Sequence, residues 1–261
     1  MANKVCIVES DKIVDGTSLM EGNFDLVKWD SNLSNLINGT YMFRDCISLT
    51  SFSGDLSNLD SGYLMFSKTS LGSFSGDLSN LTDGSYMFEE CASFTSFSGD
   101  LSSLSIGSFM FYGCNNLTSF NSNLKSLING SSMFKDASSL ASFNANLSYL
   151  INGEYMFSNT KLTSFSSDLS SLVRGQDMFG YTPLTSFNSD LSSLTNGYNM
   201  FYNCNKLINI NIGNKLKNIN IELKIPIIKE KPKAIATYLI IFCACVILFQ
   251  LLQTNKIHLH I

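Results

Sequence analysis

LTSFSSDLSSLVRGQDMF, from Leu162 to Phe179, is almost repeated by LTSFNSDLSSLTNGYNMF, from Leu184 to Phe201. Neither phrase contains a histidine or a cysteine, so the repetition points to packing rather than to chemistry. Aligned on its Met-Phe pair, the phrase occurs eight times, at intervals of 22 or 23 residues. The eight pairs begin at Met42, Met65, Met87, Met110, Met133, Met156, Met178 and Met200.

Three columns of this repeat barely vary. A Leu-x-x-Leu pair recurs from Leu33 and Leu36 to Leu191 and Leu194. An aromatic residue recurs at Trp29, Phe52, Phe74, Phe97, Phe120, Phe143, Phe165 and Phe187. A glycine recurs three residues before each Met, at Gly39, Gly62, Gly84, Gly107, Gly130, Gly153, Gly175 and Gly197. A unit this short cannot bury its apolar face alone, so the columns predict a solenoid whose stacked units share one core.

The sequence Leu-x-x-Phe flanked by Ser and Thr predicts a short strand in each unit. Strand side chains alternate, so Phe points inward and its two neighbours point outward. Parallel strands of successive coils would then lie about 4.8 Å apart. The segment around Met-Phe predicts a helical or 3₁₀ turn on the opposite side. The glycine column indicates either a positive φ or a close approach between coils.

The length variation lies in one turn between Met-Phe and the next Leu. Units of 22 residues carry Thr at that corner, and longer units carry Cys or Ala. The residues are Thr69, Thr160, Thr182, Cys46, Cys91, Cys114, Ala137 and Cys204. Because Thr and Ala replace Cys and no histidine is near, we interpret the cysteines as buried thiols rather than zinc ligands. A disulfide between Cys91 and Cys114 stays open.

The pattern G-x-x-M-F-x-x-C-x-x-L-T-S-F, as in Gly107–Phe120, resembles the BspA-like leucine-rich repeats. The resemblance covers roughly residues 29–210. It implies a right-handed leucine-rich-repeat solenoid with a parallel β-sheet on one face. Members are typically surface proteins of bacteria and some protists, so it also implies adhesion or ligand binding without catalysis.

The outward positions of the predicted strands form two columns of small polar residues. They are Ser51, Ser53, Ser73, Ser75, Ser96, Ser98, Ser119, Asn121, Ser142, Asn144, Ser164, Ser166, Ser186 and Asn188. One interpretation is a hydrogen-bonding face for a protein or glycan ligand. The other is that these residues only solvate the sheet, since aromatic and Arg side chains, which usually dominate binding, are missing from the face.

A further column is acidic or amide: Asp55, Asp77, Asp100, Asn123, Asn146, Asp168 and Asp190. These side chains could hold Ca²⁺ or could accept a backbone N–H at a turn. Asn replaces Asp freely, which favours turn capping. We therefore expect no metal and no cofactor.

Composition excludes several classes of function. The chain carries a formal charge of −4, and no Lys/Arg cluster lies on the repeat, so no nucleic-acid partner is expected. Its only histidines, His258 and His260, lie in the last four residues. A catalytic triad needs a base, and the repeat holds no histidine. We therefore expect that the protein is not an enzyme.

The flanks of the repeat suggest caps and a membrane anchor. Residues 1–28 are the candidate N-terminal cap and show no secretory signal. Two alternating segments within 208–228, joined near Gly213-Asn214, predict a β cap. Residues 234–252, AIATYLIIFCACVILFQLL, are uncharged and long enough for one transmembrane helix, which leaves 253–261 as a short tail.

The sequence alone therefore predicts a membrane-tethered, non-enzymatic recognition or adhesion module, with the solenoid over residues 29–207. Lys229, Lys231 and Lys233 precede the apolar segment and favour a cytosolic solenoid, whereas the resemblance favours display at the cell surface. The alternatives are a cytosol-facing, tail-anchored scaffold and a purely structural spacer.

Overall fold

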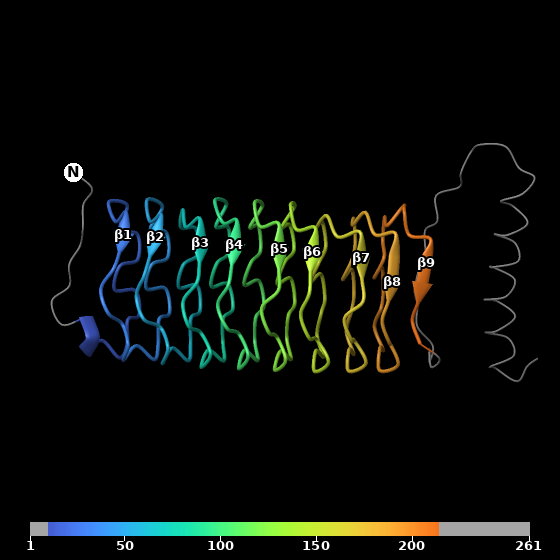
Figure 1. The fold of residues 1–261 in the computed structure, drawn as a ribbon, viewed down its shortest axis with the longest axis horizontal. Helices are drawn as coiled ribbons and strands as arrows, with labels where there is room; N and C mark the ends of the chain where they lie inside the picture. The colour runs from blue at the N-terminus through green and yellow to red at the C-terminus, as the bar shows by residue number, and fades with distance from the viewer. Residues whose placement is uncertain (1–9, 214–261) are drawn as a thin grey trace, which may run out of the picture. The chain divides into compact units, whose positions relative to one another are not determined.

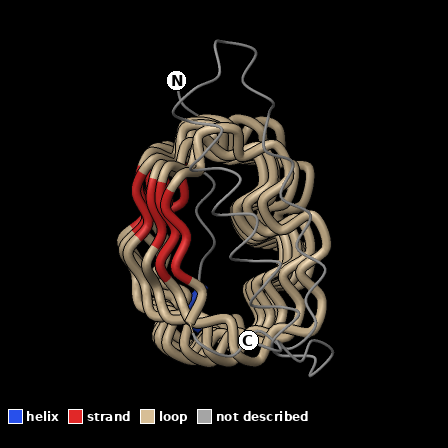
Figure 2. Tube along the Cα trace, turned by 90° about the vertical axis from the view of Figure 1, so that its right-hand side faces the viewer, coloured by secondary structure: helices blue, strands red, loops and turns tan. Residues whose placement is uncertain are grey.

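The computed structural model of the chain describes residues 10–213 as a stack of coils, each contributing one very short strand (Figure 1). A 3₁₀ helix, η1 (Ser10–Lys12), precedes the coils. The strands are β1 (Lys28–Trp29), β2 (Ser51–Phe52), β3 (Ser73–Phe74), β4 (Ser96–Phe97), β5 (Ser119–Phe120), β6 (Ser142–Phe143), β7 (Ser164–Phe165), β8 (Ser186–Asn188) and β9 (Asn209–Asn211). Viewed along the stack, they lie on one side of the coil (Figure 2). The predicted leucine-rich-repeat fold with short parallel strands is confirmed.

The parallel strands pair in register, so each aromatic residue lies over its counterpart, as Phe74 does over Phe97. They form four short sheets rather than one, in the order β1-β2, β3-β4, β5-β6 and β7-β8-β9. A second parallel ladder runs without a break from Asp15–Asn38 to Arg174–Asn196, directly before the glycine column. The longest backbone ladder of the described chain therefore lies away from the strand face.

The Met-Phe side of each coil is where the prediction of helical or 3₁₀ turns is wrong. In the coil of Tyr86, alternate amides donate to the next coil: Tyr86 N–H bonds to Ser108 O at 2.9 Å and Phe88 N–H to Met110 O at 2.9 Å. The amides between them close turns within the coil, such as Met87 N–H to the Gly84 oxygen at 3.1 Å. In a helix, each interior amide donates to a carbonyl of the same helix. Here every second amide donates to the neighbouring coil instead, so the segment cannot form a helix.

Left-handed residues make this alternation possible. Tyr86 has φ 60° and Glu90 has φ 53°, and the same two positions are left-handed in the other described coils. A residue with positive φ ends a helical run, and it is the third residue of a type II turn. The segment is therefore a series of turns that keeps its amides aimed along the stack.

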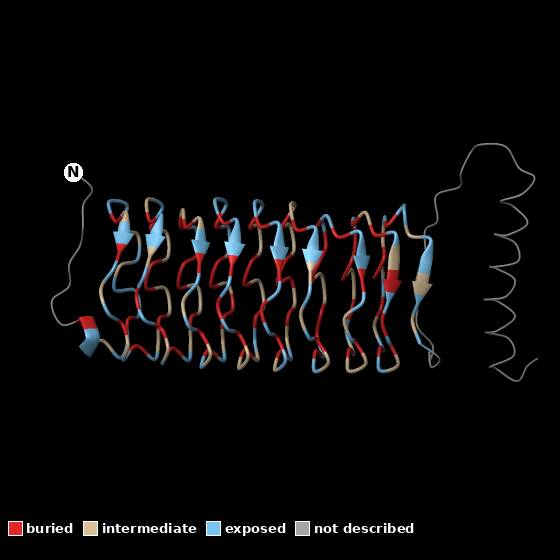
Figure 3. Ribbon diagram, in the orientation of Figure 1, coloured by how far each residue is buried: buried red, intermediate tan, exposed pale blue. Residues whose placement is uncertain are grey.

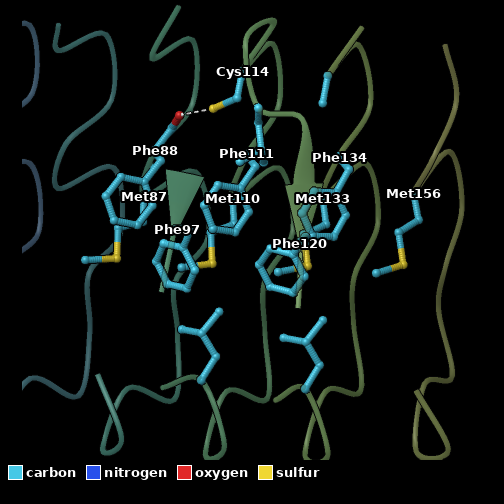
Figure 4. Packing of buried hydrophobic residues seen from close by; sticks show 14 of the residues in the cluster. Met87, Phe88, Phe97, Met110, Phe111, Cys114, Phe120, Met133, Phe134 and Met156 are labelled. Atoms are coloured by element: carbon cyan, nitrogen blue, oxygen red, sulfur yellow. Dashed lines mark hydrogen bonds between the residues drawn. The ribbon is translucent and has the colours of Figure 1, made fainter. Parts of the chain in front are cut away.

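Two columns of aromatic rings fill the core between the strands and these turns (Figure 4). Phe111 stacks on Phe88 at 5.5 Å between ring centroids and on Phe134 at 5.4 Å. The strand column stacks likewise, with Phe97 and Phe120 at 5.9 Å. Phe120 meets Phe111 at an interplanar angle of 62°. Rings thus stack along the solenoid and pack edge to face across it, the two geometries that aromatic pairs favour.

The glycine column is explained by close approach. None of its described glycines has a positive φ. A Cβ added at Gly39 would lie 2.7 Å from Met65 Sδ and 3.2 Å from Leu59 Cδ1. Each glycine therefore leaves room for the methionine of the next coil. The residue with positive φ is not the glycine but the one two positions after it.

The described chain extends the repeat at both ends. Gly16 N–H bonds to Asn38 O at 2.8 Å and Met20 N–H to Met42 O at 2.9 Å, so part of the predicted cap 1–28 pairs as another coil. At the other end β9 pairs parallel to β8. The rest of the predicted cap to residue 228, the apolar segment 234–252 and the tail 253–261 lie outside the described residues. No helix within residues 10–213 has the length and apolar character needed to cross a membrane.

Replacing Gly39 with Val should lower the free energy of unfolding by about 1–3 kcal/mol or more, because Met65 and Leu59 are fully buried and cannot both move away. Gly72→Val is the matched control, since a Cβ there meets nothing within 4 Å. Urea denaturation followed through the fluorescence of the buried Trp29 would measure both. Equal denaturation midpoints for the two variants would contradict the packing role of the glycine column.

Candidate functional site

The strand face presents the predicted polar columns to solvent (Figure 3). The structure brings all fourteen of the predicted residues to this side of the coils. All are exposed except Ser186, which is half-buried. The aromatic residue between each pair is buried or half-buried, as the alternation predicts.

The hydroxyl groups on this face are not engaged by the rest of the described chain. Among residues 10–213, the side chains of its serines make no hydrogen bond to another protein group, which leaves them to water or a ligand. The threonines that precede the strands differ, since Thr95 Oγ1 donates to Gly72 O at 3.0 Å and Thr185 Oγ1 to Thr163 O at 2.9 Å. At the last coils, Asn211 Nδ2 donates to Asn188 Oδ1 at 2.7 Å. The face is thus a series of short parallel sheets carrying unengaged hydroxyls.

The acidic and amide column caps turns, which confirms that prediction. Each side-chain oxygen accepts the backbone N–H two residues later, at 2.8–3.0 Å. Asn123 and Asn146 do this as Asp100 does, because the bond needs an oxygen acceptor and not a charge. Within the described residues, no three His, Cys, Asp or Glu side chains are arranged to hold a metal ion.

A second capping column was missed by the sequence reasoning. The residue before the repeat glycine accepts the N–H two residues later, at 2.9–3.2 Å. The residues that do so are Asp15, Asn38, Asp83, Asn129, Asn152 and Asn196. The signal was the frequent Asn-Gly and Asp-Gly dipeptide three residues before Met-Phe, which is a common turn signature.

Cys and Thr residues at the corner donate a hydrogen bond to the backbone carbonyl of a Met-Phe phenylalanine, in one of two ways. Cys114 Sγ donates to Phe88 O of the preceding coil at 3.1 Å (Figure 4), whereas Thr160 Oγ1 donates to Phe157 O of its own coil at 2.9 Å. The four described cysteines are buried free thiols, so Cys91 and Cys114 are not joined. Burial raises the pKa of the Cys91 and Cys46 thiols to about 11 and also raises those of Cys114 and Cys204. Thiols of this kind are poor nucleophiles and poor metal ligands.

The Met-Phe side of the coils lies opposite the strands and is called the turn face below. It carries an aromatic row that sequence reasoning also missed. The row is formed by Tyr41, Tyr63, Tyr86 and Phe109, whose successive ring centroids are 5.5, 5.8 and 4.6 Å apart. All four side chains are half-buried. They occupy the two positions after the repeat glycine, which looked unimportant because they vary from unit to unit.

Comparisons with known proteins agree with this architecture. The family description "BspA type Leucine rich repeat region" matches residues 19–129 and 104–223, in six copies. A crystal structure of a leucine-rich repeat protein from Bacteroides ovatus is similar to 80% of this chain, with a TM-score of 0.53 and 20% identity. The chain spans 66% of that protein's length, and at this identity the likeness concerns the fold alone. No curated protein matches the chain.

In the native protein, Cys46, Cys91, Cys114 and Cys204 should resist iodoacetamide at pH 8. Their burial blocks access, and at a pKa of about 11 only ~0.1% of the Cys91 thiol is ionised. All four should react rapidly once guanidinium unfolds the repeat. Mass spectrometry of the labelled peptides would report each site separately. Native labelling of Cys91 at the unfolded rate would show that the corner is open.

Proposed function

We propose that this chain, which belongs to the BspA-type leucine-rich repeat family, acts as a non-enzymatic adhesion module that holds an extended ligand along its strand face. Repeats of this family generally serve as interaction scaffolds. The observation that carries the proposal is the array of exposed, unengaged hydroxyls at equivalent positions of the coils from β2 to β8, paired in register within β3-β4, β5-β6 and β7-β8. The ligand is a protein or a glycan with regularly spaced hydrogen-bonding groups.

The regular spacing supports binding by many weak contacts. One hydrogen bond adds only about 0.5–1.5 kcal/mol, so a single Ser pair would bind little. Rows about 4.8 Å apart on a rigid core add their contacts within one binding event, because the later contacts form at high effective concentration. A flat, repetitive face therefore suits a long, repetitive ligand better than a small molecule.

The chemistry of the face argues for binding over a purely structural spacer. None of its fourteen outward residues is charged. A rod under no requirement except solubility would carry Lys and Glu on its exposed strands, which also protect against unwanted pairing. Neutral hydroxyl and amide groups cost less to dehydrate when a partner covers them.

A charge placed on the strand face tests the proposal. Ser96→Lys with Ser119→Lys puts two cations on adjacent rows, and a covering ligand would have to bury them unpaired, so binding should fall at least about tenfold. The purified full chain would be applied to a panel of immobilised matrix proteins and to a glycan array. Ser93→Lys with Ser193→Lys is the control, since both serines are exposed, lie off the strand face and add the same charge. Equal loss in both pairs, or unchanged binding in the first pair, would contradict a strand-face ligand.

The membrane tether is the second part of the proposal. Residues 234–252 would anchor the module as a single transmembrane helix, with the solenoid displayed outside the cell. Protease treatment of intact cells expressing an N-terminally tagged chain should then remove the tag and the solenoid. If both survive until the membrane is permeabilised, the solenoid faces the cytosol. The adhesion proposal would then fail in favour of an internal scaffold.

A further inference from the structure

The turn face differs from the strand face in how its outward residues vary. The strand positions are Ser or Asn in almost every unit, whereas the outward turn positions range from Gly to Tyr, Glu and Lys. The inward Met and Phe between them are constant, so this variation is not imposed by the core. A surface that differs from coil to coil can recognise one ligand in one register, which a uniform face cannot.

The charge of this surface is one-sided. Between Gly84 and Thr182, the acidic residues at outward turn positions are Glu89, Glu90, Asp136, Glu154 and Asp177. At the same positions Lys135 is the single basic residue, and Lys68 of the coil before Gly84 pairs with Glu90 at 3.8 Å. The carboxylates lie close to the aromatic side chains. Burial is the main cause that raises the pKa of Tyr86, and the charge of Glu89 is the second. For Tyr155, burial again raises the pKa most, followed by the charge of Asp177.

Basic side chains of the chain itself already lie on these rings. Lys135 Nζ is 5.2 Å from the ring centroid of Tyr155 and 5.9 Å from that of Tyr112. In the aromatic row itself, the Arg44 guanidinium lies 5.3 Å from the Tyr41 centroid. These are cation–π distances, so the tyrosines of the turn face provide sites at which an ammonium or guanidinium group is attracted.

Lys135 also lines a hollow of about 360 Å³ on this face. Asp136 and Asp177 supply its carboxylates, and the side chains of Tyr155 and Tyr181 supply its aromatic walls. Asn159 Nδ2 holds Asp136 by donating to Oδ1 at 2.9 Å, and Gln176 Nε2 donates to Tyr155 Oη at 2.9 Å. Its polar lining is thus oriented by neighbours in the next coil.

We propose that this turn face binds a segment of a partner protein that carries Arg or Lys side chains, with one of them seated in the hollow between Asp136 and Asp177. The acidic charge opposes a nucleic acid. The surface is separate from the strand face, so its ligand is additional to the one proposed above.

The first test removes charge without changing shape. Asp136→Asn with Asp177→Asn keeps the size of both side chains, and Asn tolerates the left-handed backbone that both positions require. The control is Asp100→Asn with Asp168→Asn, the same charge change at two turn caps where Asn serves equally well. Binding of the full-length chain to a labelled Arg-Gly-Ser peptide would be measured by fluorescence anisotropy, with a Glu-Gly-Ser peptide as the second probe.

The proposal requires that the Arg peptide binds, that the Glu peptide does not, and that the Asp136/Asp177 variant weakens binding about tenfold while the control does not. Lys135→Gln should tighten binding, since it removes the competing cation. If both pairs of Asp→Asn substitutions weakened peptide binding equally, the effect would come from the net charge of the protein, and the proposed site would be wrong. Absence of Arg-peptide binding at low salt would also overturn it, while leaving the strand-face experiment unaffected.

Discussion

The hydrogen bonds between successive coils on the turn face are the constraint on which the other features depend. Phe43 N–H bonds to Met65 O, Phe66 N–H to Met87 O, and the same bond recurs at 2.8–2.9 Å through Phe179 N–H to Met200 O. These bonds fix the distance between coils. Once that distance is set, the rings inside must stack at their observed separation. The glycine must also be small, because the next coil's methionine lies against it.

Left-handed residues are the conformational cost of these hydrogen bonds. Tyr41, Leu64, Tyr86 and Phe109 adopt φ values of 56–60°, which L residues other than Gly, Asn and Asp rarely take. Each such residue costs roughly 1–2 kcal/mol, and the cost is offset by neighbours on both sides rather than within its own coil. The stability of one unit is therefore inseparable from the units stacked on it, as nearest-neighbour coupling in repeat proteins requires.

This dependence explains which features could be predicted from the sequence. The inward strand aromatics and the Asp100 column were predictable, because side-chain alternation and turn capping are local rules. The turns around Met-Phe were not, because Tyr86 and Glu90 have no preference for left-handed backbone. Their conformation is set by hydrogen bonds to Ser108 and Tyr112, about a full repeat away. The aromatic row was missed for a related reason. Its residues are scattered over variable positions, and only the stacking of coils brings Tyr63, Tyr86 and Phe109 together.

Stacking also divides the two faces chemically. The strand columns hold the same small neutral residues in almost every coil, so they present one chemistry at a repeat of about 5 Å. Where a column varies, successive coils can alternate in charge. Glu21 pairs with Arg44 at 3.5 Å, and Lys68 pairs with Glu90 at 3.8 Å, each pair at equivalent positions of neighbouring coils. Asp136 lies beside Asn159 in the same way. The recognition through charge that we propose therefore uses the turn face, where the repeat is free to vary, and the proposed recognition through repetition uses the strand face.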